Sequence, residues 1–125
     1  MVGDITVLPS IHLDILAGTE ILVGSDALRV GETLDRVELV VYGTLTTNVS
    51  GREQTIFRSM AADPRPGDWQ GIRLGQSGSA FLRHTRIEHA RYGLFAEKLN
   101  RALTLEEVEI FRAGEDGIHL EDVLE

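Results

Sequence analysis

The side chains best able to carry out chemistry are concentrated in one short stretch of this sequence. They are His84, Arg86, Glu88, His89, Arg91 and Tyr92. Glu88, His89 and Arg91 include a candidate general acid and base, but the sequence supplies no third group to orient them. A metal ion requires three or four converging ligands, and in a strand His84 and His89 point to opposite faces unless the chain turns between them. The simpler interpretation of this stretch is an exposed polar strand face.

Trp69, the one tryptophan of the chain, directly follows a segment rich in proline, residues 59–68. Because this segment lacks alternating apolar residues, we expect a loop excursion from the regular structure. Beside such a loop the indole could stack on a sugar ring, and Trp69 then joins a candidate ligand-binding set completed by Arg86, Glu88, His89, Arg91 and Tyr92. The alternative is that Trp69 packs inside and seals the loop onto the domain, which is the usual position of tryptophan.

Acidic residues are grouped at Glu115-Asp116 and Glu121-Asp122, and Asp63 and Asp68 flank the proline-rich segment. None of these groups has the regular spacing of oxygen ligands, with its glycine, that a calcium loop requires. We interpret them as solvated acidic turns, and we expect no metal and no cofactor.

The bulk composition argues against several kinds of partner. The 125 residues carry a formal net charge of −8, which disfavours nucleic acid because binding it requires Lys and Arg to neutralise phosphates. The same charge disfavours anionic membrane surfaces, and no apolar run is long enough to insert into a bilayer. The chain has no cysteine, so it uses neither disulfides nor thiolate chemistry.

A four-residue phrase recurs through the second half of the chain. Residues 71–74, 93–96 and 117–120 each begin with glycine, at spacings of 22 and 24 residues. Four further residues return 23 positions later in similar form: Leu82, Thr85, Ile87 and Ala90 reappear as Leu105, Val108, Ile110 and Ala113. A period of this length, built from short alternating apolar runs, predicts a solenoid whose turns consist of β-strands.

The first half of the chain follows the same pattern with less regularity. Alternating apolar residues occupy segments 5–7, 11–15, 21–23 and 37–41. The stretch Glu106–Glu125 is dense in Glu and Leu and could form a helix, but glycines interrupt it and the repeat favours strands. We therefore predict one all-β domain over residues 1–125, with the excursion at about 59–68.

The repeat also predicts which charges become neighbours. A shift of 23 residues places Arg86 beside Glu109, Arg83 beside Glu106 and His84 beside Glu107. Parallel neighbours lie about 4.8 Å apart, so stacked charges of opposite sign favour this register.

Several segments resemble bacterial right-handed parallel β-helix proteins of the pectate-lyase-like superfamily. They are Leu13–Ile21, Tyr42–Thr47, Gln54–Ser59, Pro66–Ile72 and His84–Leu94. The most distinctive is Pro66–Ile72, which is similar to the family's Trp-x-Gly-Ile step back into the helix. The resemblance extends from about Ile5 to Leu120 and implies a single-stranded right-handed parallel β-helix, a short solenoid of few coils.

The resemblance leaves the function open, because this superfamily includes enzymes, adhesins and non-catalytic scaffolds. Its catalytic members use clustered aspartates, and in this chain aspartate is nearly absent from the regular strands. We therefore expect a non-catalytic structural or interaction module of a larger bacterial surface or secreted protein. The alternative is a carbohydrate-binding or polysaccharide-degrading protein that holds a polysaccharide along its outer groove.

Localisation and association are expectations of the same kind. The opening residues lack the basic and apolar regions of a signal peptide, so the expected secreted or cell-surface location depends on the resemblance, and a cytoplasmic one stays open. A β-helix exposes unpaired strand edges at its ends, and residues 121–125 are too short to form a capping helix. We expect a homodimer through these ends, which the negative charge keeps from stacking without limit.

Overall fold

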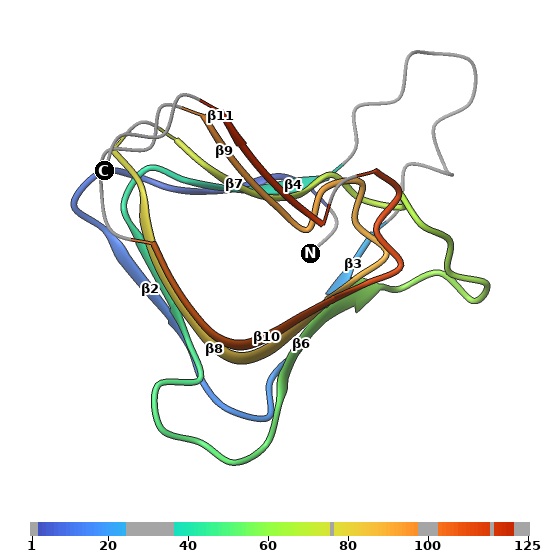
Figure 1. Cartoon of the computed structure of the whole chain (residues 1–125), viewed down its shortest axis with the longest axis horizontal. Helices are drawn as coiled ribbons and strands as arrows, with labels where there is room; N and C mark the ends of the chain where they lie inside the picture. Colours follow the sequence, from blue (N-terminus) through green and yellow to red (C-terminus); the bar gives the residue numbers. More distant parts are fainter. Residues whose placement is uncertain (1–2, 25–36, 76, 98–102, 116, 122–125) are drawn as a thin grey trace.

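The chain is all-β in the computed structural model, which describes residues 3–24, 37–75, 77–97, 103–115 and 117–121. No helix occurs among these residues, so none crosses a membrane. The strands are drawn in Figure 1. Their bounds are β1 Ile5–Val7, β2 His12–Ile15, β3 Glu20–Val23, β4 Glu38–Val41, β5 Thr44–Thr47, β6 Thr55–Ser59, β7 Gly71–Leu74, β8 Ser79–Glu88, β9 Leu94–Glu97, β10 Leu103–Phe111 and β11 Ile118–Glu121.

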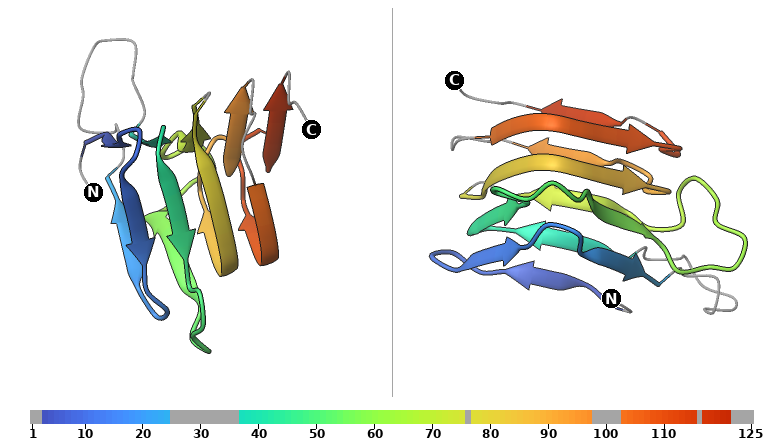
Figure 2. Two further views of the ribbon diagram at one scale, coloured as in Figure 1. Left: turned by 90° about the vertical axis from the view of Figure 1, so that its left-hand side faces the viewer. Right: turned by 90° about the horizontal axis from the view of Figure 1, so that it is seen from below.

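The strand pairs among the described residues are all parallel and belong to two sheets. The first has the order β1-β4-β7-β9-β11, and the second has the order β2-β5-β8-β6-β3 with β10 paired to β8. The chain crosses from one sheet to the other after each visit, so the strands form layers that follow the sequence from β1 to β11 (Figure 2). The expectation of an all-β chain with parallel strands is confirmed.

The strand β8 spans the width of the second sheet. Its first half pairs with β5, its second half pairs with β6, and β10 pairs with it over nearly its full length. Between the two halves the backbone bends at His84, where φ is 45°, and β10 bends at Glu107, where φ is 51°. These are left-handed conformations that residues other than glycine adopt uncommonly. In the preceding layer, residues 48–54 form a loop at the same corner.

The register confirms the repeat found in the sequence. Leu94 pairs with Ile72 on one side and with Ile118 on the other. In the second sheet, Leu105 pairs with Leu82 and Ile110 pairs with Ile87. The stretch beginning at Glu106 contributes to β10 and β11, so the strand interpretation is also confirmed.

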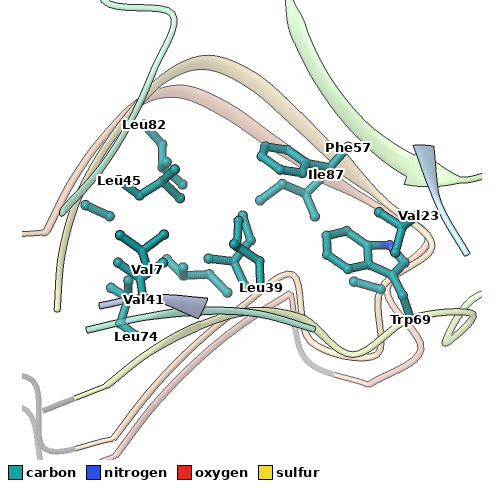
Figure 3. Close-up of a cluster of buried hydrophobic side chains, with 14 of the residues drawn as sticks. Val7, Val23, Leu39, Val41, Leu45, Phe57, Trp69, Leu74, Leu82 and Ile87 are labelled. Atoms are coloured by element: carbon teal, nitrogen blue, oxygen red, sulfur yellow. The ribbon is translucent and has the colours of Figure 1, made fainter. Parts of the chain in front are cut away.

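Stacked layers place like side chains above one another in the core (Figure 3). The registers define ladders that include Leu39-Ile72-Leu94, Val7-Val41-Leu74-Ala96, Leu13-Leu45-Ala80-Leu103 and Ile21-Phe57-Ile87-Ile110. The central members are buried, whereas Leu13, Ile21, Leu103 and Ile110 are only partly buried. Burial of apolar surface in these ladders is the main favourable term of the fold.

Polar side chains enter this interior only with partners. Thr85 Oγ donates to the carbonyl of Arg83 at 2.7 Å, so the hydroxyl of Thr47 is the donor in its 2.6 Å bond to Thr85. The side chain of Asn48 donates to the carbonyls of Glu53 and His84 and accepts from the backbone of Gly51. These bonds satisfy groups whose burial would otherwise be costly.

Ion pairs between layers support the same register on the outer surface. Arg83 lies 3.9 Å from Glu106, as the repeat predicted, and Arg58 pairs with Glu20. Arg86 lies beside Glu109 in the register, but it forms an ion pair with Glu88 of its own strand. The predicted neighbours His84 and Glu107 both lie at the backbone bend, between the two paired stretches of β8 and β10.

Residues 60–68 leave the sheets between β6 and β7, close to the segment 59–68 where the sequence predicted an excursion. The chain returns at Gly71, whose φ is +119° and where a Cβ atom would lie 1.6 Å from the carbonyl oxygen of Tyr92. Because glycine has no Cβ atom, it alone permits the backbones of the two layers to approach this closely at position 71.

The ladder of Ile87 gives a direct test of the register. Ile87 is fully buried, so Ile87→Ala is expected to lower the free energy of unfolding by about 2–5 kcal/mol in urea titrations. Leu16, which is 68% exposed, is the matched control, and Leu16→Ala should cost about 0.5 kcal/mol or less. Equal costs for the two variants would contradict the core described above.

Candidate functional site

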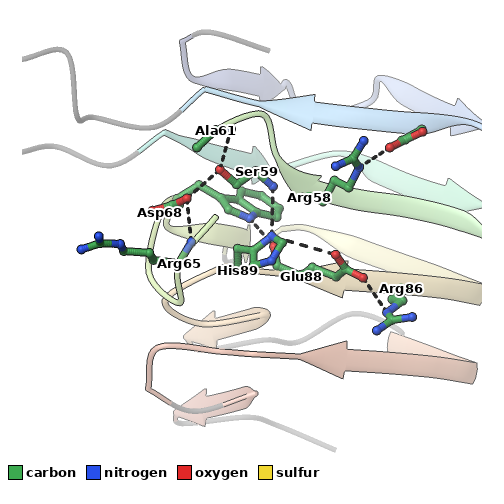
Figure 4. A network of polar contacts seen from close by, with 10 residues as sticks. Arg58, Ser59, Ala61, Arg65, Asp68, Arg86, Glu88 and His89 are labelled. Carbon is green, nitrogen blue, oxygen red and sulfur yellow. Dashed lines mark hydrogen bonds and ion pairs between the residues drawn. The ribbon is translucent and has the colours of Figure 1, made fainter. Parts of the chain in front are cut away.

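The candidate residues cluster at the end of β8 and in the turn that follows, but they separate into two groups. Arg86, Glu88 and His89 follow one another at the end of β8, near the base of the excursion (Figure 4), and Trp69 donates its indole N–H to the carbonyl of Glu88. Arg91 and Tyr92 lie beyond the turn and contact Glu115. The six residues therefore do not form one ligand-binding surface.

Trp69 is a core residue. Its side chain has no exposed surface, and its ring stacks on Phe57 with a centroid distance of 6.1 Å and an interplanar angle of 19°. Its indole N–H donates to the carbonyl of Glu88 at 2.8 Å, and the backbone forms a bridge with Ala90. The indole thus offers no face to a sugar, and the packing interpretation replaces the stacking one.

His89 is also turned inward. Its backbone φ is 66°, which marks the turn after β8, and the residue is 7% exposed. The amide of Ser59 donates to Nδ1 at 3.4 Å, so Nδ1 is the acceptor in this contact. The His89 carbonyl accepts from the amide of Gly67 at 2.9 Å. His89 therefore joins β8 to both ends of the excursion.

Ser59 and Asp68 complete this attachment. The interpretation of Asp68 as part of a solvated acidic turn was wrong, because its carboxylate accepts hydrogen bonds within the chain, and Ser59 was not considered from the sequence. The Ser59 hydroxyl donates to Asp68 Oδ2 at 2.7 Å and accepts from the amide of Ala61 at 3.1 Å. Asp68 Oδ2 also accepts from the amide of Arg65 at 3.1 Å. Through these two bonds the Asp68 carboxylate joins the end of the excursion to Ser59, just before its start, and to Arg65 within it. The position of Asp68 directly before the tryptophan was the available signal.

Arg86 and Glu88 contact each other on the outer face of β8. Arg86 Nε lies 2.7 Å from Glu88 Oε1, yet this buried nitrogen makes no hydrogen bond of ordinary geometry, so the contact is an ion pair with a misdirected N–H. The guanidinium of Arg86 covers the ring of Phe111 at 4.4 Å from its centroid. Glu88 Oε2 is 3.9 Å from His89 Nδ1. Both charged groups are therefore occupied by neighbouring side chains.

Arg91 and Tyr92 share one acceptor from the next layer. Arg91 Nε donates to Glu115 Oε1 at 3.0 Å, and the Tyr92 hydroxyl donates to Oε2 at 2.7 Å. The hydrogen bond to Glu115 raises the pKa of Arg91 above its ordinary value. Glu115 was read from the sequence as a solvated acidic turn, although the repeat spacing that placed other charge pairs also places it beside these two residues.

The described residues contain no group of three histidine or acidic side chains that could hold a metal ion. The hollows on the described surface include the following two. One, of about 50 Å³, lies beside Arg73 and Phe95 and has room for a few waters at most. The other, of about 250 Å³, lies at a corner between the sheets and is lined by Pro9, Ser10, Tyr42, Thr44, Ser77 and Ser79.

No protein-family model matches this chain, and no curated protein or solved structure is significantly similar to it.

The core position of Trp69 predicts a large effect of its removal. Trp69→Ala should lower the free energy of unfolding by about 3–5 kcal/mol, because it leaves a cavity against Phe57. Urea titrations followed by circular dichroism measure this change. Unchanged stability, combined with loss of binding to a glycan, would instead favour the stacking interpretation.

The anchoring of the excursion is tested separately. Asp68→Ala removes the acceptor of the buried Ser59 hydroxyl and should cost about 1–3 kcal/mol, seen as a lower melting temperature. In Asp63→Ala, the matched control from the same segment, the lost carboxylate is 89% exposed, and stability should stay within about 0.5 kcal/mol. Ser59→Ala combined with Asp68→Ala should cost less than the sum of the single changes, and strict additivity would contradict the bond.

Proposed function

We propose that this protein is a non-catalytic structural or interaction module built as a short, single-stranded right-handed parallel β-helix. In this proposal each layer is one coil, with one strand in the first sheet and the rest in the second. The alternation between parallel sheets and the aliphatic ladders support this architecture. It is the architecture of the pectate-lyase-like superfamily, which the sequence resembles, and we propose a larger bacterial surface or secreted protein as its context.

The observation that carries the proposal is that β10 has one edge without a described partner strand and inner-face apolar residues that are only partly buried. Within the described residues β10 pairs with β8 alone, so its other edge is unpaired. The inner-face residues Leu105, Val108 and Ile110 are only partly buried, so the ladders end there in apolar side chains. An edge of this kind accepts a further parallel strand, because unpaired backbone groups and apolar surface are offered together.

The occupant that we propose for this edge is a second copy of the chain, which gives a homodimer. The two copies would pair through the β10 edges and cover the partly buried ladder ends. The net charge of −8 per chain opposes the addition of many copies. A small closed oligomer is therefore favoured over an open stack.

The polysaccharide hypothesis receives less support from the same residues. Trp69 and His89 are buried, and Arg86, Glu88, Arg91 and Tyr92 have partners within the chain. A ligand at these positions would have to displace existing contacts, so the proposed role is structural.

Light scattering at raised salt, where charge repulsion is screened, measures the association. The chain should have the mass of a dimer, and Leu105→Lys should shift it to monomer because it places a charge in the proposed interface. Val49→Lys, at a loop residue that is 56% exposed, is the control and should remain dimeric. A wild-type monomer at high protein concentration would rule out the homodimer.

A further inference from the structure

The larger hollow lies where successive layers turn from the first sheet into the second. Its walls come from the turn between β1 and β2, the junction of β4 and β5, and the turn between β7 and β8. Its volume of about 250 Å³ approaches the range of small-ligand pockets. None of the residues considered above as ligand contacts lines it.

Glycine and backbone bonds give this corner a fixed shape. At Gly43 a Cβ atom would lie 2.2 Å from the carbonyl oxygen of Ile11, so only glycine lets the neighbouring turn pack this closely. That turn is closed by a bond of 3.0 Å from the amide of Ile11 to the carbonyl of Leu8. Ser10, within it, has a φ of 69°. The position of Ser10 in the pocket wall is therefore determined by the backbone of the turn between β1 and β2.

The aromatic wall is equally constrained. The ring of Tyr42 lies over Gly75, where a Cβ atom would come within 2.3 Å of the ring carbons. Gly75 donates its amide to the carbonyl of Val41 at 2.8 Å, which holds the glycine beside the tyrosine. The half-buried Tyr42 ring thus has a defined position in the pocket before any ligand binds.

The remaining walls carry hydroxyl groups with unused bonding capacity. Thr44 and Ser79 share one hydrogen bond of 3.0 Å, so whichever hydroxyl donates in it, the other keeps a proton to donate. The hydroxyl of Ser77 donates to the carbonyl of Tyr42 at 2.8 Å and keeps its lone pairs as acceptors. The pocket therefore offers both donors and acceptors at short range.

No charged side chain is among the described residues that line this pocket. An anion would meet no cation among these described lining residues and would approach a chain whose net charge is −8. An uncharged molecule with hydroxyls on its rim and a C–H face for the tyrosine ring fits the lining, because each hydroxyl can both donate and accept.

From these observations we infer that the corner pocket binds an uncharged sugar ring, a neutral hexose unit, with the ring against Tyr42 and its hydroxyls bonded to Thr44, Ser77 and Ser79. The ligand class follows from the hydroxyl groups and from the absence of charged side chains among the described lining residues, independently of the proposed structural role.

The test is a titration of the ¹⁵N-labelled chain with glucose, galactose and mannose, followed by two-dimensional NMR. At least one hexose should give saturable shifts at the amides of Ser10, Gly43, Thr44 and Ser79. The combined variant Thr44→Val with Ser79→Ala should weaken this binding at least tenfold. Ser77→Ala, which changes only an exposed hydroxyl, should also weaken it and serves if the first variant does not fold.

Thr104→Val is the matched control, because Thr104 is an exposed strand threonine outside the pocket. The affinity of this variant for the hexose should be unchanged. Galacturonic acid should bind more weakly than the best neutral hexose. The inference is overturned by three results: no saturable shifts at the corner, equal loss of affinity in the control, or tighter binding of the acid. Since β10 does not line the pocket, none of these results bears on the dimer measurement.

Discussion

Parallel pairing between successive layers is the constraint on which the rest of this molecule depends. Each pair of strands aligns residue with residue, so a side chain that points inward stands on one that also points inward. The core is consequently a set of ladders, in which Leu39, Ile72 and Leu94 are consecutive steps. A shift of one residue would turn these side chains to the solvent, which makes the register strongly determined.

The same stacking explains why the corners carry the unusual residues. Where the chain changes direction, the layers can remain in contact only if their backbones approach closely. Gly43, Gly71 and Gly78 meet backbone atoms of the adjacent layer at distances that a Cβ atom would forbid. Elsewhere the bends fall on residues with left-handed backbone, such as His84 and His89. Polar groups brought inside at these places are bonded, as the interaction between Ser59 and Asp68 illustrates.

Much of the fold could be predicted from the sequence because repetition is visible in it. The 23-residue shift predicts the pairing of Leu82 with Leu105 and of Ile87 with Ile110, and both pairs occur in the structure. The alternation of apolar residues that predicted strands agrees with β8, where Thr85 and Ile87 are buried and Arg86 and Glu88 are partly exposed. The bend at His84 was not predicted, since it depends on one backbone torsion that leaves no clear trace in composition.

The candidate site was much less predictable. Chemically active residue types drew attention to Trp69 and His89, but their burial depends on how residues 60–68 return to the sheets. The corner pocket was missed because its lining comes from three separate turns, and serine and threonine in turns are common. Residues that are neighbours through a regular repeat can be found by counting, whereas residues brought together by irregular turns cannot.

One strand has consequences for how the molecule opens. β8 pairs with β5, β6 and β10, so it holds together segments that are otherwise separated by the loop at residues 48–54. Neither β5 nor β6 can detach without breaking bonds to this strand, which couples their local unfolding into one cooperative unit. In a structure where each layer contacts only its neighbours, such a shared strand extends cooperativity across the width of the sheet as well as along the stack. Amide hydrogen exchange should accordingly be slowest at the centre of β8 and should quicken toward β2 on one side and β10 on the other.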